Sequence, residues 1–275
     1  KDHPFWGLYE RTMEAHYSPH PLSHRVLGTE ETVGGLTPEV MRGYFERRYS
    51  ADNTAVALAG NLDFDEAVRW IESRCGGWAA TGTAREDARP ETNESRTVRM
   101  TEENIARAYM LMMTPAPGVQ DDRRYASMML SQVLGEPGNS RLHWALVETG
   151  LAEEAVAAYD ARDNVGDYLV YASCDPEASE EVWSVVEKEI DALAASLTED
   201  DLERLRNKLA TAVTLAGERP GGRMQRLGRT QLNLGEYMSL DDELARINAV
   251  TLDDLRSVHR AFPFEPRTTG VVVPA

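Results

Sequence analysis

The stretches "LTPEVMRGYFERRYSADNTAVALAG" (36–60) and "VTLDDLRSVHRAFPFEPRTTGVVVP" (250–274) align without a gap. Thr37 corresponds to Thr251, an offset of 214 residues. In both stretches the threonine is placed to cap a helix, a loop with aromatic residues follows, and a short aliphatic segment ends the unit. Few residues are identical, so the shared order of cap, helix, loop and strand carries the comparison. A repeat of this length predicts a duplicated domain rather than a solenoid.

The repeat sets the expected domain boundaries. A complete second copy is expected over 96–275, and the C-terminal part of a truncated first copy over 1–80. Between them, 81–95 ("TGTAREDARPETNES") contains Gly and Pro but no large apolar residue, which is typical of a linker. If the copies are similar in length, the same offset places the start of the first copy about 118 residues before Lys1.

Strand and helix patterns alternate along the chain. The segment "NTAVALAGN" (53–61) is predicted to be a short buried strand of the first copy. In the second copy, "EAVAAYDARD" and "GDYLVYASCD" are predicted to be an antiparallel pair. The run "RTVRMTEENIARAYMLMMTPAP" fits two strands or one long bent strand. Several amphipathic helices lie between these segments, and one of them begins with a capping-box pair, Thr198 and Asp201.

Composition limits the class of protein. Hydrophobic residues make up 42% and charged residues 27%, as in ordinary globular domains. The net charge of −17 argues against a nucleic-acid partner, and no apolar run reaches the roughly 18 residues of a membrane span. We therefore expect a soluble protein. The 26 Arg against 3 Lys favour a G+C-rich bacterial gene, with cytoplasm and periplasm both open. Cys75 and Cys174 are expected to be buried free thiols.

Half of the histidines lie in "HYSPHPLSH", at the evenly spaced positions His16, His20 and His24. Histidines four apart on one helix can chelate zinc, but Pro19 and Pro21 interrupt the helix between these three. No nearby pair of cysteines or glutamates completes a ligand set. We therefore expect surface or helix-end histidines and no metal site. Three further histidines are isolated and are expected to be structural: His3, His143 and His259.

Two longer stretches resemble one known family. "HPLSHRVLGTEETVGGLTPEVMRGYFERRYSADNTAVALAGNLDFDEA" is similar to the back half of the catalytic domain of insulinase/pitrilysin-type zinc metallopeptidases, which include mitochondrial processing peptidase. "LGEPGNSRLHWALVETGLAEEAVAAYD" resembles the middle of that family's inactive C-terminal domain. The resemblance covers nearly the whole chain. It implies an α+β fold of duplicated two-layer α/β-sandwich domains, each with an antiparallel or mixed sheet and helices on one face.

The resemblance also implies where the chemistry lies. The family binds zinc through an inverted H-x-x-E-H motif and a distal glutamate, and the motif's own glutamate activates a zinc-bound water. This chain has no H-x-x-E-H, and the matching positions fall upstream of Lys1. No catalytic residue and no metal ligand are therefore expected in the chain, while zinc is expected in the full-length parent.

Inactive domains of the family often hold substrate with an Arg and a Tyr around an "REkkGLAY"-like turn. The corresponding turn here is "LVETGLAE", with Val147 and Glu153 at those positions, so the substrate-binding residues are unknown. Arg141 is expected to make a helix-start or interdomain hydrogen bond.

We expect the non-catalytic portion of an insulinase-type zinc endopeptidase, forming the chamber wall and the inactive domain. The parent's partners would be peptide substrates and a homo- or heterodimeric clamshell partner, without nucleic acid or membrane. One alternative is a scaffold or partner subunit of the same fold, as in the core subunits of a respiratory complex. A further alternative is an unrelated acidic α/β binding protein, which would lack the duplication.

Overall fold

The computed structural model describes residues 4–83, 90 and 94–275. The described residues divide into two compact units. Unit 1 is drawn from Lys1–Arg25, Arg89–Ala210 and Ala245–Ala275, and unit 2 from Val26–Ala88 and Thr211–Leu244. Much of the predicted linker 81–95 lies outside the described residues. The boundaries expected from the repeat (1–80, 81–95, 96–275) stay a prediction about domain ancestry. The two compact units do not follow these boundaries, because each contains residues from both predicted domains.

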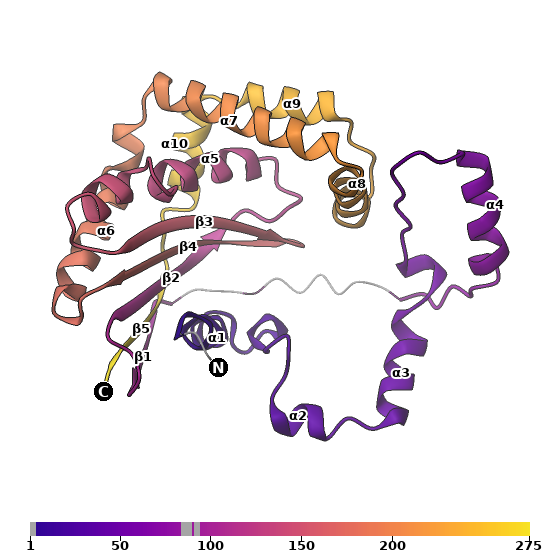
Figure 1. Ribbon diagram of the computed structural model, residues 1–275, viewed down its shortest axis with the longest axis horizontal. Coiled ribbons are helices and arrows are strands. Elements are labelled where there is room, and N and C mark those ends of the chain that lie inside the picture. Colours follow the sequence, from indigo (N-terminus) through magenta and orange to yellow (C-terminus); the bar gives the residue numbers. More distant parts are fainter. Residues whose placement is uncertain (1–3, 84–89, 91–93) are drawn as a thin grey trace. The chain divides into compact units, whose positions relative to one another are not determined.

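Unit 1 contains a five-stranded mixed sheet in the order β1-β5-β2-β4-β3 (Figure 1). β5 pairs parallel with β1 and antiparallel with β2, and the remaining neighbours are antiparallel. The predicted hairpin is confirmed as β3–β4, and the run that fitted one or two strands forms two, β1 and β2. The strand bounds are β1 Arg96–Glu102, β2 Ala108–Ala116, β3 Glu154–Arg162, β4 Val165–Cys174 and β5 Thr268–Pro274.

Helices cover both faces of this sheet (Figure 1). One face carries α5 (Arg124–Gly135), α6 (Ser179–Ser196) and α10 (Leu252–Ala261). The other face carries α1 (Pro4–Tyr17), so the expected α+β mixed sheet is confirmed but its helices are not restricted to one side. The reason is in β2, whose nearly unbroken apolar run "AYMLMM" makes both faces of the middle strands hydrophobic.

The side chains of β2 alternate between these two layers. Leu111 and Met113 join Leu8 of α1 in a buried cluster, whereas Met110 and Met112 point to the opposite face. All four of these β2 side chains are at most 2% exposed. Burial of this kind contributes roughly 1.5–3 kcal/mol for each side chain, so β2 stabilises the packing on both faces of the sheet.

The crossing of α1 over β5 depends on Gly270. A Cβ at Gly270 would lie 2.1 Å from Thr12 Oγ1 and 2.7 Å from Leu8 Cδ1, closer than real contacts allow. Both helix residues are fully buried. The hydroxyl of Thr12 donates to the carbonyl of Leu8 at 2.7 Å, which keeps its polar atom satisfied inside the core. A glycine at this position therefore allows the helix to pack directly against the strand backbone.

Unit 2 contains α2 (Glu30–Gly34), α3 (Pro38–Arg48), α4 (Phe64–Cys75) and α8 (Pro220–Leu234). Helices α7 (Glu199–Glu218) and α9 (Leu240–Ala249) contribute residues to both units. The short 3₁₀ turns of the chain are Pro21–Ser23, Ala51–Asn53 and Pro176–Ala178. No helix of the described residues is both long enough and apolar enough to cross a bilayer.

The two predicted caps are both formed. The hydroxyl of Thr37 accepts from Val40 N at 3.3 Å at the start of α3, and that of Thr251 accepts from Asp254 N at 3.2 Å at the start of α10. Asp254 also accepts from Thr251 N, which completes a capping box. The cap and helix of the repeat are therefore alike in both stretches.

The strand predicted for 53–61 is wrong for this chain. Residues 54–59 form no strand, and Val56 and Leu58 are 57% and 47% exposed instead of buried. A strand requires a hydrogen-bonded neighbour, and none of the described residues supplies one to this segment. The prediction that both cysteines are buried holds for Cys174, whereas Cys75 is half-buried; both are free thiols.

Substitution of Gly270 tests the crossing of α1 and β5. Gly270→Ala is expected to lower the free energy of unfolding by about 1–3 kcal/mol, because the methyl group would force helix and strand apart. Gly221→Ala is the matched control, since nothing lies within 4 Å of a Cβ at that helical position. Urea denaturation measures both. Equal stability of the two variants would contradict the close-packing role of Gly270.

Candidate functional site

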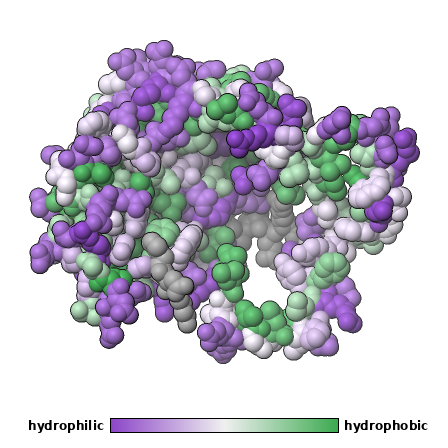
Figure 2. Space-filling model, viewed as in Figure 1, coloured by the Kyte–Doolittle hydropathy of each residue, from purple (hydrophilic) through white to green (hydrophobic). Residues whose placement is uncertain are grey.

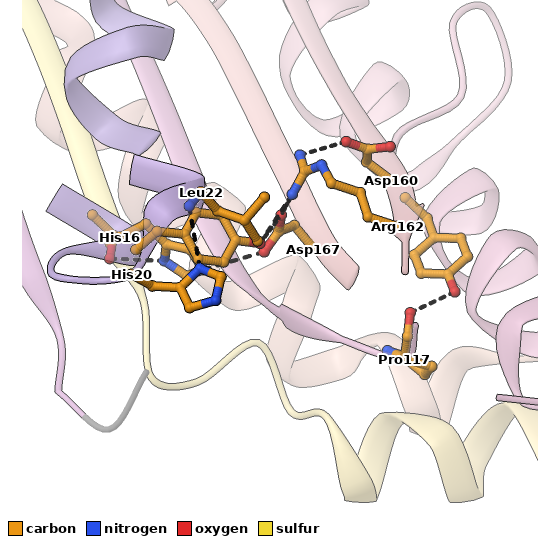
Figure 3. Close-up of polar contacts among 10 residues, drawn as sticks. His16, His20, Leu22, Pro117, Asp160, Arg162 and Asp167 are labelled. Atoms are coloured by element: carbon orange, nitrogen blue, oxygen red, sulfur yellow. Dashed lines mark hydrogen bonds and ion pairs between the residues drawn. The ribbon is translucent and has the colours of Figure 1, made fainter. Parts of the chain in front are cut away.

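A buried polar network joins the end of α1 to the sheet, and it includes the first histidine of "HYSPHPLSH" (Figure 3). His16 Nδ1 lies 3.0 Å from Thr268 Oγ1, and His16 Nε2 lies 3.2 Å from Asp167 Oδ1. The phenol of Tyr17 donates to the other oxygen of Asp167. All four residues are at most 2% exposed. Both ring nitrogens of His16 are therefore engaged inside the protein.

Arg162 supplies the positive charge of this network. Its Nη1 donates to Asp167 Oδ2 at 2.6 Å and to the Tyr17 hydroxyl at 3.0 Å, and its Nη2 donates to Asp160 Oδ2 at 2.5 Å. Asp167 is thus a buried carboxylate with an arginine, a phenol and an imidazole as partners. A buried charge is tolerated when it is paired and hydrogen-bonded in this way.

Burial and charge shift the pKa values of the network. Burial raises the pKa of Tyr17 well above its ordinary value, and the neighbouring Asp167 carboxylate raises it further. Burial lowers the pKa of Arg162, but the combined effect of Asp167, Tyr17 and Asp160 is larger, so the net pKa is raised. Tyr17 therefore stays a proton donor and Arg162 stays a cation at physiological pH. Tyr17 and Arg162 therefore hold α1 against the sheet, and neither offers a labile proton for chemistry.

The other two histidines of the motif lie apart from the network. His20 is half-buried, and its Nδ1 accepts from Leu22 N at 3.2 Å at the start of a 3₁₀ turn (Figure 3). His24 is exposed. The prolines do separate the three imidazoles, as predicted. The expectation of a surface or helix-end position holds for His24 and His20 but must be corrected for His16, which ends α1 yet is buried.

The remaining histidines are placed separately. His143 Nε2 lies 3.1 Å from Glu148 Oε1 near the surface. His259 on α10 has a buried Nε2 that finds no hydrogen-bond partner among the described residues. His3 lies outside the described residues. Among residues 4–83, 90 and 94–275, no group of three or more His, Cys, Asp or Glu could hold a metal ion. The donor atoms that the structure brings together therefore do not fit zinc.

The turn at the expected substrate position is built around a π-helical turn, His143–Val147. Val147 is half-buried, and the Glu153 carboxylate is paired with Arg107, which also binds Asp175. Gly150 has φ +76°, which allows the chain to reverse there. Neither Val147 nor Glu153 offers the cation and phenol that would hold a peptide, so this turn lacks that kind of site.

Arg141 makes its contacts within unit 1. Its Nη2 donates to Ser196 O at 2.8 Å and to Asp201 Oδ2 at 3.1 Å. Asp201 also accepts from Thr198 N and from the Thr198 hydroxyl at the start of α7. Arg141 therefore supports the α6–α7 junction, which agrees with the expected helix-start contact and not with an interdomain one.

Sequence reasoning did not find Arg162, Asp167 and Tyr17. One signal was available: Asp167 interrupts "VGDYLVYASC", an otherwise apolar strand. A charged residue in such a run is seldom fully buried unless it has a partner. The partners themselves lie 150 residues away in Tyr17 and five residues away in Arg162, and no spacing rule joins them.

Comparison with known proteins gives a consistent result. A family model described as the peptidase M16 inactive domain matches residues 35–209. An uncharacterised zinc protease of Streptomyces coelicolor is 32% identical over 261 residues, which cover 92% of this chain and 56% of that protein. An uncharacterised zinc protease of Mycobacterium tuberculosis is 28% identical and is matched over 94% of this chain and 60% of its own length. The chain thus spans less than two thirds of the length of these relatives.

Solved structures share the fold at low sequence identity. A protease from Helicobacter pylori has a TM-score of 0.86 at 17% identity, with 98% of this chain and 67% of that chain covered. A peptidase M16 inactive domain from Pseudomonas fluorescens has a TM-score of 0.85 at 16% identity, with 98% and 65% covered. A chain of complex III2 from Candida albicans has a TM-score of 0.83 at 17% identity, with 98% and 67% covered.

Substitution of Asp167 tests the polar network. Asp167→Asn is expected to lower the free energy of unfolding by about 3–5 kcal/mol, because it leaves the half-buried Arg162 without its main counter-charge. Asp160→Asn is the control: its side chain is 47% exposed, so the loss should stay below about 1 kcal/mol. Equal losses measured by urea denaturation would show that the burial of Asp167 has no special importance.

The buried His259 predicts a dependence of stability on pH. Burial lowers the pKa of His259 below its ordinary 6.5, although a hydrogen bond with the carbonyl of Ile190 opposes this. The unfolded chain then binds the proton more readily than the folded one. Neutral His259 therefore makes its full contribution to the free energy of unfolding above about pH 6.5. This contribution is lost as the pH falls through and below that value.

His259→Gln should lose less stability than the unsubstituted chain between pH 7 and pH 5. Urea midpoints at both pH values give the comparison, since titration of the carboxylates is common to the two proteins. The same pH dependence in both would exclude His259 as the cause.

Proposed function

Because this chain belongs to the peptidase M16 inactive-domain family, we propose that it is the non-catalytic portion of a longer zinc metalloendopeptidase. In this proposal the chain forms part of the wall of a peptide-binding chamber and supplies the inactive domain. The zinc-binding H-x-x-E-H motif would lie in polypeptide outside the 275 residues. The whole protein would cleave peptides within the chamber, with a homo- or heterodimeric clamshell partner.

One observation carries the proposal. The relatives that are called zinc proteases extend well beyond the matched region, and the sequence of this chain has no H-x-x-E-H. Zinc-dependent hydrolysis needs a ligand set and a general base near the metal-bound water. The described residues do not bring such a set together. The chemical step is therefore assigned to the remainder of the parent, and no step is assigned to side chains of this chain.

The structure of unit 1 supports a wall and not a reactive centre. Its most strongly paired titratable groups, Asp167 and Arg162, hold α1 against the sheet and are directed at each other. At the turn where related inactive domains hold substrate, Glu153 is engaged with Arg107. A peptide would consequently meet a paired carboxylate at Glu153 rather than a cationic anchor.

A scaffold or partner subunit of the same fold is the second candidate function. The observation that favours it is the replacement of the expected Arg and Tyr by Val147 and Glu153. The two candidates differ in the parent's sequence. A complete H-x-x-E-H with a distal glutamate favours the peptidase, whereas an interrupted motif favours the scaffold.

Zinc content and peptide hydrolysis test the proposal. The purified 275-residue chain is expected to hold substoichiometric zinc by mass spectrometry of the metal and to leave an unfolded peptide intact. The full-length parent is expected to hold one zinc per active site and to lose hydrolysis when the motif glutamate is changed to Gln. Stoichiometric zinc together with turnover by the 275-residue chain alone would contradict the proposal. A parent without zinc would favour the scaffold.

A further inference from the structure

A groove lies beside α1, on the side of the unit 1 sheet that this helix covers. Hydrophobic residues also reach the surface elsewhere, over α2 and beside α4 (Figure 2). The groove has a volume of about 340 Å³, and its floor includes Val156, Ala158 and Leu169. α1 packs mainly against β1, β2 and β5. On β3 and β4 beside it, Ala158 is exposed, while Val156 and Leu169 are half-buried. The apolar floor is therefore open to a ligand.

The alternation of β3 determines which side chains this floor presents. Residues two apart on a strand share a face, and the β3 residues that share the groove's face are Glu154, Val156, Ala158 and Asp160. Asp160 lies opposite Asp167 in the ladder, and the contacts of Asp167 with α1 identify this face as the α1 side. The strand thus presents two apolar residues between two acidic ones. The acidic residues are about 20 Å apart along the strand.

Both ends of the groove carry an excess of negative charge. At one end Glu154 lines the groove, is exposed, and forms no ion pair with any of the described residues. At the other end Arg162 is shared between Asp160 and Asp167, so that one guanidinium faces two carboxylates (Figure 3). A cation that approaches either end would therefore be attracted, and Glu154 offers it a free carboxylate.

Two aromatic rings close the groove toward α1. Phe5 of α1 and Tyr171 of β4 both line it, with ring centroids 5.1 Å apart and ring planes at 90°. Burial raises the pKa of Tyr171 to about 12, and the nearby carboxylate of Glu154 adds to the rise, so the phenol keeps its proton at physiological pH. Aromatic rings pack against apolar groups and also attract cations over their faces. This wall is therefore suited to an apolar side chain that has a cationic neighbour.

We propose that this groove binds peptides in which apolar side chains are flanked by lysine or arginine. The apolar side chains lie on Val156 and Leu169, and a flanking cation pairs with Glu154. The inference deepens the proposed function and rests on it in one respect, namely that peptides reach this face of unit 1 in the parent. It adds the class of peptide that this face selects: acidic peptides are repelled, because like charges would meet at both ends of the groove.

A second copy of this chain fits the groove less well than a basic peptide does. Each copy carries a net charge of −17, so the approach of two copies brings like charges together. The volume of about 340 Å³ is at the lower end of the range for small-ligand sites. Such a volume accommodates a few side chains of a flexible peptide rather than a folded surface.

Peptide binding to the 275-residue chain tests the proposal without zinc and without hydrolysis. The probe is a fluorescein-labelled peptide amide, Lys-Gly-Leu-Gly-Leu-Gly-Lys, which repeats the alternate spacing of the acidic and apolar residues of β3. One comparison peptide has glutamate in place of both lysines, and another has alanine in place of both leucines. Fluorescence anisotropy should show binding of the probe at least about fivefold tighter than binding of either comparison peptide, and weaker binding as salt is raised. Equal affinity for the lysine and glutamate peptides, or no saturable binding of the probe, would overturn the proposal.

Matched variants locate the binding in the groove. Glu154→Gln should weaken binding of the probe by about threefold or more, whereas Glu180→Gln, the same change at an exposed position of α6, should not. Ala158→Arg adds bulk and positive charge to the floor and should weaken binding by about tenfold, whereas Ala192→Arg on the exposed surface of α6 should not. Thermal unfolding midpoints confirm that the four variants are folded. Equal affinities of each variant and its control would place the peptide elsewhere and overturn the proposal.

This test and the test of the proposed function fail separately. A parent without zinc or hydrolysis would leave the peptide affinity of the 275-residue chain unchanged. A parent that hydrolyses peptides, together with a 275-residue chain that does not bind the probe, would overturn only the inference about the groove. Self-association of the chain that Ala158→Arg abolishes would also overturn it, because the occupant of the groove would then be a second copy.

Discussion

The absence of a side chain at Gly270 sets how closely α1 approaches β5, and the other contacts of this helix depend on that distance. With Thr12 and Leu8 directly against the strand backbone, His16 at the end of the helix is brought next to Thr268, two residues along the same strand. The same placement brings Tyr17 to Asp167 on β4. The apolar cluster and the polar network are therefore two consequences of one close contact between a helix and a strand.

The polar network fixes the position of α1 along the sheet. An apolar interface alone would allow α1 to slide or rotate at small cost, because dispersion contacts are not directional. The imidazole of His16 and the phenol of Tyr17 bind defined oxygens, and Arg162 neutralises the carboxylate that accepts from them. Burial of Asp167 carries a desolvation penalty, and such groups are weak sources of net stability. Their contribution here is the fixed position of the helix along the sheet.

Local patterns allowed elements of both units to be predicted. The alternation and turn between 154 and 174 indicated the β3–β4 hairpin, and the threonines at 37 and 251 indicated two helix starts. The features that could not be predicted depend on partners that are distant in the chain. Residues 54–60 have strand composition, but a strand exists only with a neighbour. Asp167 could be noticed as a charge in an apolar run, whereas its binding to Tyr17 requires the folded arrangement. Local sequence pattern also does not indicate that α1 packs with the second repeat.

The packing of α1 has a consequence for how such a protein can be inherited. Residues 4–25 precede the first repeat's cap but pack in unit 1, and residues 211–244 lie within the second repeat but pack in unit 2. In the predicted duplication, each half therefore contributes a helix to the compact unit of the other half. Neither half is a transferable module: a gene fusion or fission between the repeats would leave β5 without its covering helix. Recombination should accordingly keep the two halves together, and divergence between them should proceed within one reading frame.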